Sequence, residues 1–360
     1  MLTTSLLEDA RAISDRIVSL RRAIHSEPEL GLETPKTLDK VRGELADLPL
    51  EWRMGTSCTG AVAVLRGSKG GRSVLLRGDM DALPMEEHTG LDFASTIPGR
   101  MHACGHDTHT AMLAGAARVL AAKQEELTGE VHFMFQPGEE GHHGARFMIE
   151  DGLLDPSPDA AFAIHIMPNA RHGVVGSRAG ALLAAADMFE IAVTGRGGHA
   201  SMPHDTRDPV PVAAEIVTAL QAMVTRKFNA AEATIVTVSQ LDAGSAHNII
   251  PDKAVMKGTM RTLSAERRKA VRVAITHLAK GIASAHEMEA HVELIEGFPP
   301  TINDPRAVAL GEAVARELGG EEAFQWMEHP IMGAEDFSYV LQQIPGAMFF
   351  LGVSHQGDDW

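Results

Sequence analysis

Apolar and polar positions follow two different patterns along the chain. Residues 5–24 carry apolar side chains at helical spacing among charges, which predicts an amphipathic helix. From residue 61 onward, four short apolar runs bounded by Gly, Pro or Asp predict buried strands at 61–65, 73–77, 131–135 and 160–166. Ala-rich helical stretches lie between these runs, notably 108–123. Strands that alternate with helices predict an α/β domain with a largely buried, at least partly parallel sheet.

A different pattern begins near Asp187. It predicts, in chain order, a strand at 188–195, a helix at 209–227, strands at 234–244 and 254–263, a helix at 264–288 and a strand at 291–297. This is the ferredoxin-like order, which gives an antiparallel sheet with helices on one face. A helix at 304–318 and the apolar run MFFLGVSH then resemble the first pattern again. We therefore predict a discontinuous mixed-sheet α/β domain (1–185 and 298–360) with an inserted α+β domain (186–297).

Composition excludes several functional classes. The net charge of −16 argues against non-specific nucleic-acid binding, which requires a cationic surface. The two cysteines, Cys58 and Cys104, provide no disulfide framework, so a reducing cytoplasm is the expected location. The first thirty residues lack an unbroken apolar run, and no stretch approaches the 18 apolar residues of a spanning helix. We expect neither a signal peptide nor a membrane span.

Groups that bind metals or transfer protons follow three of the predicted strands. Asp79 and Asp81 come after the run that ends at Arg77, Glu139 and Glu140 come after 131–135, and His165 lies near the end of 160–166. In open α/β sheets, ligands bind outside the carboxyl ends of the strands. A single His at a strand end is usually a hydrogen-bonded structural residue, but groups at three strand ends can converge. We expect them to form one site.

The segment MHACGHDTH (101–109) precedes the Ala-rich helix and contains the sharpest signal. Cys104 and His106 flank a glycine, so a tight backbone turn can bring both side chains to one point. A cysteine at a helix amino terminus has its thiolate favoured, and the thiolate is the form that binds metal. The alternative is a buried structural cysteine beside surface histidines.

Thiolate, imidazole and carboxylate together suit zinc, with manganese, cobalt or nickel as alternatives. Structural zinc normally takes four closed ligands from two C-x-x-C-like hooks, which this chain lacks. A catalytic metal site is therefore expected. The adjacent pair Glu139 and Glu140 suggests that one carboxylate binds metal while the other transfers protons; alternatively the pair belongs to a solvated acidic loop.

Eight ordered segments resemble the M20 metallopeptidase superfamily, over roughly residues 10–355. They are RGDMDALPMEE (77–87), MHACGHDTHTAMLAG (101–115), FQPGEEG (135–141), IHIMP (164–168), GRGGHASMPH (195–204), HNIIPD (247–252), GTMRT (258–262) and GAEDFS (333–338). The resemblance is to its aminoacylase-like amidohydrolase branch, which includes hippurate hydrolases, N-acyl-amino-acid amidohydrolases and auxin-conjugate hydrolases. It implies that the α/β domain is catalytic and that the inserted domain is a dimerisation or lid domain.

The resemblance also implies roles for individual residues. The ligands of a pair of divalent metal ions would be Cys104, His106, Glu140 and His165. Glu139 would be the general base and later the acid, and Asp81 a supporting aspartate beside a ligand or metal. Asp79 stands where other branches place a ligand histidine, so it is not assigned to the metals.

The inserted domain supplies the remaining implied residues. His199 would stabilise the oxyanion of an active site across a dimer interface, while Asn248 and Arg261 would hold the substrate's free carboxylate. Simpler interpretations remain for two of them: His199 could be a turn residue in a Gly-rich loop, and Arg261 a surface charge on a strand.

The implied function is hydrolysis of N-acyl amino acids of the hippurate type to a carboxylate and a free amino acid, by a cytoplasmic homodimer. One alternative is a dipeptidase of the same superfamily, which needs an acidic group for the free α-amine; Glu335 and Asp336 are the candidates. The other is a non-catalytic metal-binding relative.

The last expectation concerns the carboxyl terminus. Relatives in this branch continue beyond the strand resembling MFFLGVSH into a loop whose His completes the metal site, whereas the residues GVSHQGDDW of this chain do not match that loop. His355 occupies the preceding turn and is not expected to substitute. We therefore expect the 360-residue chain to be poorly active and to lose one metal readily on dialysis, and a chain extended with natural downstream residues to recover both.

Overall fold

The computed structural model describes residues 2–354 and divides the chain into two compact units. Unit 1 comprises Met1–Leu182, Thr301–Pro330 and Glu335–Trp360, and unit 2 comprises Leu183–Pro300 and Ile331–Ala334. The boundaries differ from the expected ones by three residues on each side, 182 against 185 and 300 against 297. The short return to unit 2 at Ile331–Ala334 was not predicted, because four residues carry no periodicity of their own.

Unit 1 contains an eight-stranded sheet in the order β1-β2-β4-β3-β5-β16-β6-β15. Strand β3 runs parallel to both β4 and β5, and β5 runs parallel to β16, whereas β1, β2 and β4 pair antiparallel. The mixed α/β class predicted from the sequence is confirmed. The strands are β1 (Glu51–Met54), β2 (Ala61–Arg66), β3 (Lys69–Asp79), β4 (Thr128–Gln136), β5 (Ala160–Arg171), β6 (Val175–Ser177), β15 (Phe324–Trp326) and β16 (Gly346–Ser354).

One helix of unit 1 was predicted wrongly. The single helix expected at 5–24 is two helices, because the backbone leaves helical geometry at Ile13, with φ −103° and ψ 5°. Apolar spacing continues across this break, so the periodicity alone did not reveal it. The helices are α1 (Leu2–Ala12), α2 (Ser14–His25), α3 (Pro35–Glu44), α4 (His106–Ala121), α5 (Gly144–Glu150), α8 (Pro305–Gly319) and α9 (Ser338–Leu341), with 3₁₀ turns at Gln124–Glu126 and Glu321–Ala323.

The core of unit 1 lies between the sheet and helices α2, α3 and α4. Leu20 and Ile24 of α2 pack with Ala114 of α4 and with Phe133 and Phe135 of β4. Both phenylalanines are fully buried, which ties the strand before the Glu139–Glu140 turn rigidly to the helices.

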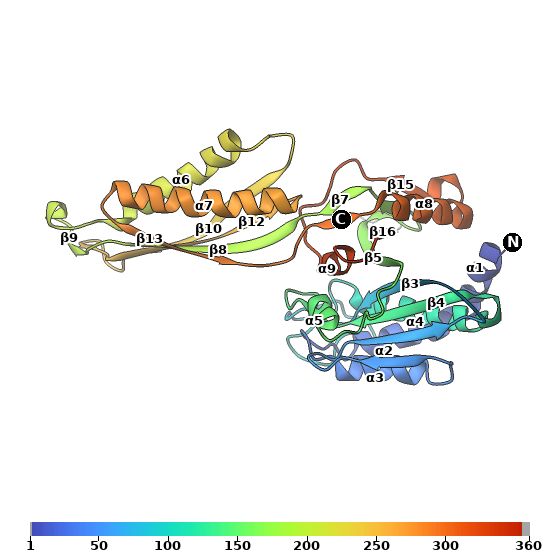
Figure 1. The fold of residues 1–360 in the computed structure, drawn as a ribbon. Helices are drawn as coiled ribbons and strands as arrows, with labels where there is room; N and C mark the ends of the chain where they lie inside the picture. Colours follow the sequence, from blue (N-terminus) through green and yellow to red (C-terminus); the bar gives the residue numbers. More distant parts are fainter. Residues whose placement is uncertain (1, 355–360) are drawn as a thin grey trace. The chain divides into compact units, whose positions relative to one another are not determined.

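Unit 2 has the ferredoxin-like order expected for the inserted domain. Its antiparallel sheet runs β10-β12-β8-β13, and helices α6 and α7 lie along one face (Figure 1). Phe189, Ile191 and Val193 of β8 point into the helix-covered core, while the alternate residues point to the other face. The elements are β8 (Ala185–Thr194), α6 (Pro209–Lys227), β10 (Thr234–Ala243), β12 (Lys253–Thr262), α7 (Ala265–Ala285) and β13 (Glu289–Ile295).

Local sequence explains where the helices of unit 2 begin. Asp208 accepts a hydrogen bond from the Val210 amide and is followed by Pro209 at the first helical position, and Ser264 caps α7 through the Arg267 amide.

Two further two-stranded sheets pair β9 (Gly198–His199) with β11 (Ile249–Ile250) and β7 (Gly180–Leu183) with β14 (Thr301–Asn303); a 3₁₀ turn covers Pro203–Asp205. Among the described residues, no helix is long and apolar enough to span a membrane.

Candidate metal centre

The three strands that carry the predicted chemistry are neighbours in the sheet of unit 1. Strand β3 lies between β4 and β5, with Asp79 opposite Gln136 and Arg77 opposite Ala163. The segments that follow β3 and β4 therefore emerge at one edge of the sheet. His165 reaches the same region from within β5, because that strand continues to Arg171 rather than ending near residue 166.

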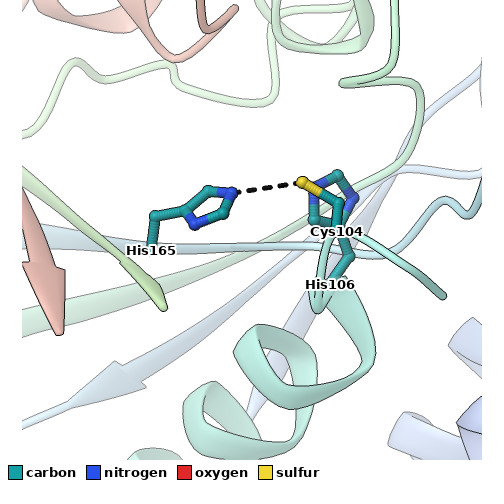
Figure 2. Close-up of side chains that lie close together, drawn as sticks. All are labelled: Cys104, His106 and His165. Carbon is teal, nitrogen blue, oxygen red and sulfur yellow. Dashed lines mark hydrogen bonds between the residues drawn. The ribbon is translucent and has the colours of Figure 1, made fainter. Parts of the chain in front are cut away.

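Cys104 and His106 approach His165 from the amino terminus of α4. Gly105, between them, has a φ of 93°, a left-handed conformation that favours glycine. The Cys104 Sγ lies 3.3 Å from the His165 Nε2 (Figure 2), and the ligand atoms of Cys104, His106 and His165 all lie within 4.8 Å of one another. Ligand atoms of His106, Glu139 and Glu140 form a second group, and they too all lie within 4.8 Å of one another. The structure thus brings the four expected metal ligands together with Glu139.

Hydrogen bonds aim the two imidazoles at this group. The His106 Nδ1 donates to the Asp81 carbonyl oxygen at 2.8 Å, and the His165 Nδ1 donates to the Ile166 carbonyl oxygen at 2.6 Å. Because a carbonyl oxygen only accepts, Nδ1 carries the hydrogen in the neutral form of each ring, and Nε2 is then the nitrogen available to a metal. The His106 Nε2 and the Glu140 Oε1, 3.9 Å apart, are both buried without a hydrogen-bond partner.

Buried lone pairs without a partner are costly, and a shared cation satisfies both at once. The residues therefore fit a divalent metal ion: Cys104, His106, Glu140 and His165 offer one sulfur, two nitrogens and a carboxylate oxygen. Burial raises the pKa of the Cys104 thiol, but hydrogen bonds and charge from His106 and His165 outweigh it and hold the pKa below its usual value. The thiolate needed for metal binding is thus favoured.

Asp81 organises the backbone around the group. Its side chain is fully buried, and its two carboxylate oxygens accept from the Glu139 and Glu140 amides, each at 2.9 Å. Its carbonyl oxygen accepts from His106. One aspartate therefore fixes three of the residues at the site.

Glu139 lies in an environment that favours its protonated form. Only 7% of the residue is exposed, and Glu335 and Asp336 lie beside it. Burial and these two carboxylates raise the pKa of Glu139 well above its usual value, against the opposing charges of His106 and Arg77. A carboxyl group of raised pKa can both accept and return a proton near neutral pH.

A buried ion-pair network beneath the site was not predicted from the sequence. Arg77 is almost fully buried and forms ion pairs with Asp79, Glu335 and Asp336, the last two at 2.8 and 3.2 Å. It also donates to the Gln136 side chain at 2.9 Å. An Arg inside an apolar run, two residues before an Asp and so on the same face of the strand, was the available signal.

A second missed residue is His109. Its Nδ1 donates to Asp79 at 2.7 Å, and its Nε2 accepts from the Ile166 amide at 2.9 Å, so both ring nitrogens are occupied. Burial lowers the pKa of His109 to about 4, despite the Asp79 charge. His109 is therefore a neutral supporting residue that has no lone pair left for a metal.

In unit 2, the structure separates the expected substrate-binding residues. His199 on β9 lies opposite Ile249, and the carbonyl of the adjacent Asn248 accepts from the Ala200 amide at 3.0 Å. His199 follows β8 and Asn248 precedes β12 at the end of this strand pair where Thr194 faces Lys253. Arg261 faces Ala186 at the opposite end. Eight residues of strand separate the two ends, about 26 Å. One chain therefore does not bring Asn248 and Arg261 to a common point. The other histidine considered from the sequence, His355 near the carboxyl terminus, lies outside the described residues.

Comparison with known proteins identifies the family to which the chain belongs. Residues 75–359 match the family described as Peptidase family M20/M25/M40. The chain is 38% identical over 359 residues to thermostable carboxypeptidase 1 of Saccharolobus solfataricus, covering 99% of this chain and 90% of that protein. It is 40% identical over 363 residues to IAA-amino acid hydrolase ILR1-like 2 of Arabidopsis thaliana, covering 99% and 81%.

The fold matches a crystal structure of the same family. This is the Bacillus subtilis YXEP protein, described as a dinuclear metal binding peptidase from the M20 family. The TM-score is 0.84 at 34% identity, covering 97% of this chain and 91% of that one. The chain therefore belongs to peptidase family M20, in its aminoacylase-like amidohydrolase branch, and is a metal-dependent amidohydrolase.

Proposed function

We propose that this protein hydrolyses the amide bond of N-acyl amino acids and releases a carboxylate and a free amino acid. The observation that carries the proposal is the buried pair of unpartnered atoms, His106 Nε2 and Glu140 Oε1, beside a Glu139 carboxyl of raised pKa. Such a site combines a metal position with a proton carrier, which amide hydrolysis requires. The relative named as an IAA-amino acid hydrolase supports this substrate class.

Two divalent metal ions belong to the proposal, with zinc or manganese preferred and cobalt or nickel as alternatives. Cys104, His106, Glu140 and His165 would hold them, and the dinuclear metal site named for the related Bacillus protein supports the number. When bound, such ions lower the pKa of water and polarise the amide carbonyl.

The chain's own residues perform the proton transfers. Glu139 takes a proton from the attacking water and passes it to the nitrogen of the departing amine. Its position is fixed because its backbone amide donates to Asp81. The neighbouring carboxylates of Glu335 and Asp336 favour the protonated form that this second transfer needs.

His199 donates a hydrogen bond to the amide oxygen, where negative charge develops. The Ser201 backbone amide donates to the His199 Nδ1 at 3.2 Å, so in the neutral ring the Nε2 carries the hydrogen. The tautomer that the structure favours is therefore the donor that the proposal requires.

We assign the free carboxylate of the substrate to Arg261 and Asn248. Because these two lie at opposite ends of unit 2, they act together only if they come from different chains. We therefore propose a homodimer in which His199 and Asn248 of one chain serve the partner's site, while Arg261 serves its own.

A dipeptidase is the second candidate, favoured by the relative named as a carboxypeptidase. It would need a free acidic group for the substrate's α-amine. Glu335 and Asp336 are both almost fully buried and pair with Arg77, so a substrate amine would have to compete with that ion pair. This competition favours substrates with a blocked amine.

A panel of N-acyl amino acids and unblocked dipeptides, incubated with the metal-loaded enzyme and read by released amine, tests the proposal. We expect benzoyl-glycine to be cleaved much faster than phenylalanyl-glycine, which has a similar size but a free amine. Faster cleavage of the dipeptide would establish the peptidase function instead.

Arg261→Ala tests the assignment of the carboxylate. We expect KM for N-acyl amino acids to rise by an amount equivalent to about 1.5–3 kcal/mol, the cost of a charged hydrogen bond, while uncharged amides change little. Arg261→Lys keeps the charge without the planar fork and should recover only part of the loss. Equal losses on charged and uncharged amides would remove Arg261 from the substrate site.

A further inference from the structure

The face of the unit 2 sheet that α6 and α7 leave uncovered carries an unusual cluster at one end. Alternation along the strands places Met188 of β8, Ile235 of β10 and Ile295 of β13 on this face. Their exposed fractions are 49%, 39% and 42%. A group of large apolar side chains exposed on one face, rather than scattered singly, marks a contact surface.

Arg261 lies between Ile235 and Met188, and Ile295 lies one strand beyond Met188. The strand register places Ile235 and Ala186 directly opposite it on the two neighbouring strands. Met188 lies one row further along β8, diagonal to Arg261, with Ile295 opposite it on β13. Adjacent strands are about 4.8 Å apart and diagonal neighbours about 7–8 Å, so Ile235 and Met188 are within side-chain reach of the guanidinium.

The acidic groups near Arg261 have other partners. Asp187 and Glu296 belong to the helix-covered side, where Arg268 forms ion pairs with both. On the open face, Glu190 pairs with Lys257 at 3.3 Å, and Lys257 lies four residues from Arg261, about 13 Å along the strand. In the described part of the chain, Arg261 is thus a cation without a carboxylate partner, with Ile235 beside it, Met188 diagonal to it and Thr259 two residues away on the same face.

We propose that Met188, Ile235 and Ile295 form a platform for the side chain of the amino acid whose carboxylate Arg261 binds. The platform selects N-acyl amino acids with a large apolar side chain, such as leucine, over N-acylglycine and over acidic residues. This inference rests on the proposed function. Hereafter "the platform" means these three residues.

The chemistry of an amino acid explains why the two features belong together. Its side chain branches from the carbon that bears the carboxylate, so a carboxylate held at Arg261 places the side chain a few ångströms from the guanidinium. There it covers apolar carbon that water otherwise contacts, which is favourable. Methionine is long and unbranched, so it can adapt to side chains of different shape. A second carboxylate on the substrate would lose hydration against the same surface.

The test compares kcat/KM for N-acetylleucine with that for N-acetylglycine, using the full metal-loaded chain. We expect a leucine-to-glycine ratio of about tenfold or more, as for other apolar contacts between enzyme and substrate. Met188→Ala and Ile235→Ala should each lower this ratio by about threefold or more, because each removes part of the platform. Binding is measured by calorimetry in the metal-loaded, inactive Glu139→Gln chain. There, each of the two substitutions should also lower the ratio of the affinity for N-acetylleucine to the affinity for N-acetylglycine.

Leu241→Ala is the matched control. Leu241 lies on the same strand as Ile235 and is 44% exposed, but it pairs with Met256 at the other end of β10. We expect its leucine-to-glycine ratio to equal that of the unchanged chain. A reduced ratio in this control would show a general effect of weakening the strand.

Two outcomes would overturn the platform, and each is distinguishable from failure of the proposed function. If N-acyl amino acids are cleaved but both variants keep the ratio, the platform does not contact the substrate. If the variants keep the ratio but change a dimer into a monomer on a sizing column with light scattering, the face is an interface between copies of the chain. If no N-acyl amino acid releases amine, the proposed function itself fails.

Discussion

At the scale of single residues, two adjacent glutamates differ through their surroundings alone. Glu140 directs an unpartnered carboxylate oxygen toward His106, whereas Glu139 lies beside Glu335 and Asp336. Both backbone amides donate to Asp81, so the turn holds the two side chains in different environments. In the proposed function, this difference is the reason for giving metal binding to Glu140 and proton transfer to Glu139.

We expect Glu139→Gln to keep the metal and to lose about 10²–10⁴-fold in turnover, because it removes the proton carrier and leaves the ligands in place. Cys104→Ala should lose metal together with activity. Metal content by atomic emission and amine release from one preparation check both results. Loss of metal in Glu139→Gln but not in Glu140→Gln would reverse the assignment.

Arg77 presents a different test, of stability. Arg77→Met leaves the buried carboxylates of Asp79, Glu335 and Asp336 without their cation, and removing one partner of a buried ion pair costs about 3–5 kcal/mol. The control is Arg66→Met. The Arg66 side chain is 52% exposed and pairs with Glu51 and Glu130, and exposed pairs contribute at most about 1 kcal/mol.

Urea unfolding of both variants in the presence of a chelator measures the difference. Equal free energies of unfolding for the two would mean that the buried carboxylates become neutral at little cost. That result would argue against Arg77 as the residue that holds the site's acidic groups together.

At the scale of elements, His25 connects three segments of unit 1. It ends α2, its Nδ1 lies 2.8 Å from Asp107 in the first turn of α4, and its Nε2 lies 3.2 Å from Glu87 in the segment after β3. Burial lowers the pKa of His25, but the hydrogen bond and charge of Asp107 and the hydrogen bond of Glu87 outweigh it. The pKa therefore lies above its usual value of 6.5.

A raised pKa in the folded state makes a pH-dependent contribution to stability. The contribution is fully present below the unfolded pKa of 6.5 and is lost as the pH rises through the folded pKa. We therefore expect His25→Gln to reduce the free energy of unfolding more at about pH 5.5 than at about pH 8.5. Denaturant titrations of the metal-free chain at both pH values measure this.

His291→Gln is the control, because His291 is exposed on β13. Its effect should stay below about 0.5 kcal/mol at either pH. If His25→Gln cost the same at both pH values, the ring would stabilise these segments by packing and neutral hydrogen bonds alone.

At the scale of the whole molecule, the 26 Å or so between Arg261 and the His199–Asn248 end of unit 2 separates residues that the proposed reaction uses together. The proposed homodimer would resolve this by assembling the site from two chains. We expect a mixture of Glu139→Gln and His199→Ala chains to regain part of the activity that each has lost, because a mixed dimer contains one intact site. Absence of recovery in verified mixed dimers would mean that His199 acts within its own chain or not at all.

The local sequence by itself determined the secondary structure, the fold class and the family of this protein. The strand–helix alternation of unit 1 and the ferredoxin-like order of unit 2 follow from apolar periodicity, and the predicted α/β class is confirmed. Gly105 between Cys104 and His106 shapes a turn within a few residues. The family also followed from short ordered motifs, because metal ligation and proton transfer each require particular side chains at fixed spacing.

Tertiary structure decided what depends on distant partners. Arg77 meets Glu335 across 258 positions of sequence, and no local pattern shows which carboxylates a buried guanidinium will pair with. His106 and His109 differ in role although both lie in the first turns of α4, because the Ile166 amide and Asp79 occupy both nitrogens of His109 alone. The separation of Asn248 from Arg261 arises from strand register, which long-range pairing sets. The sequence determines which functional groups are present. Only the packing of strands and helices determines which other groups contact them and so change their charge and hydrogen bonding.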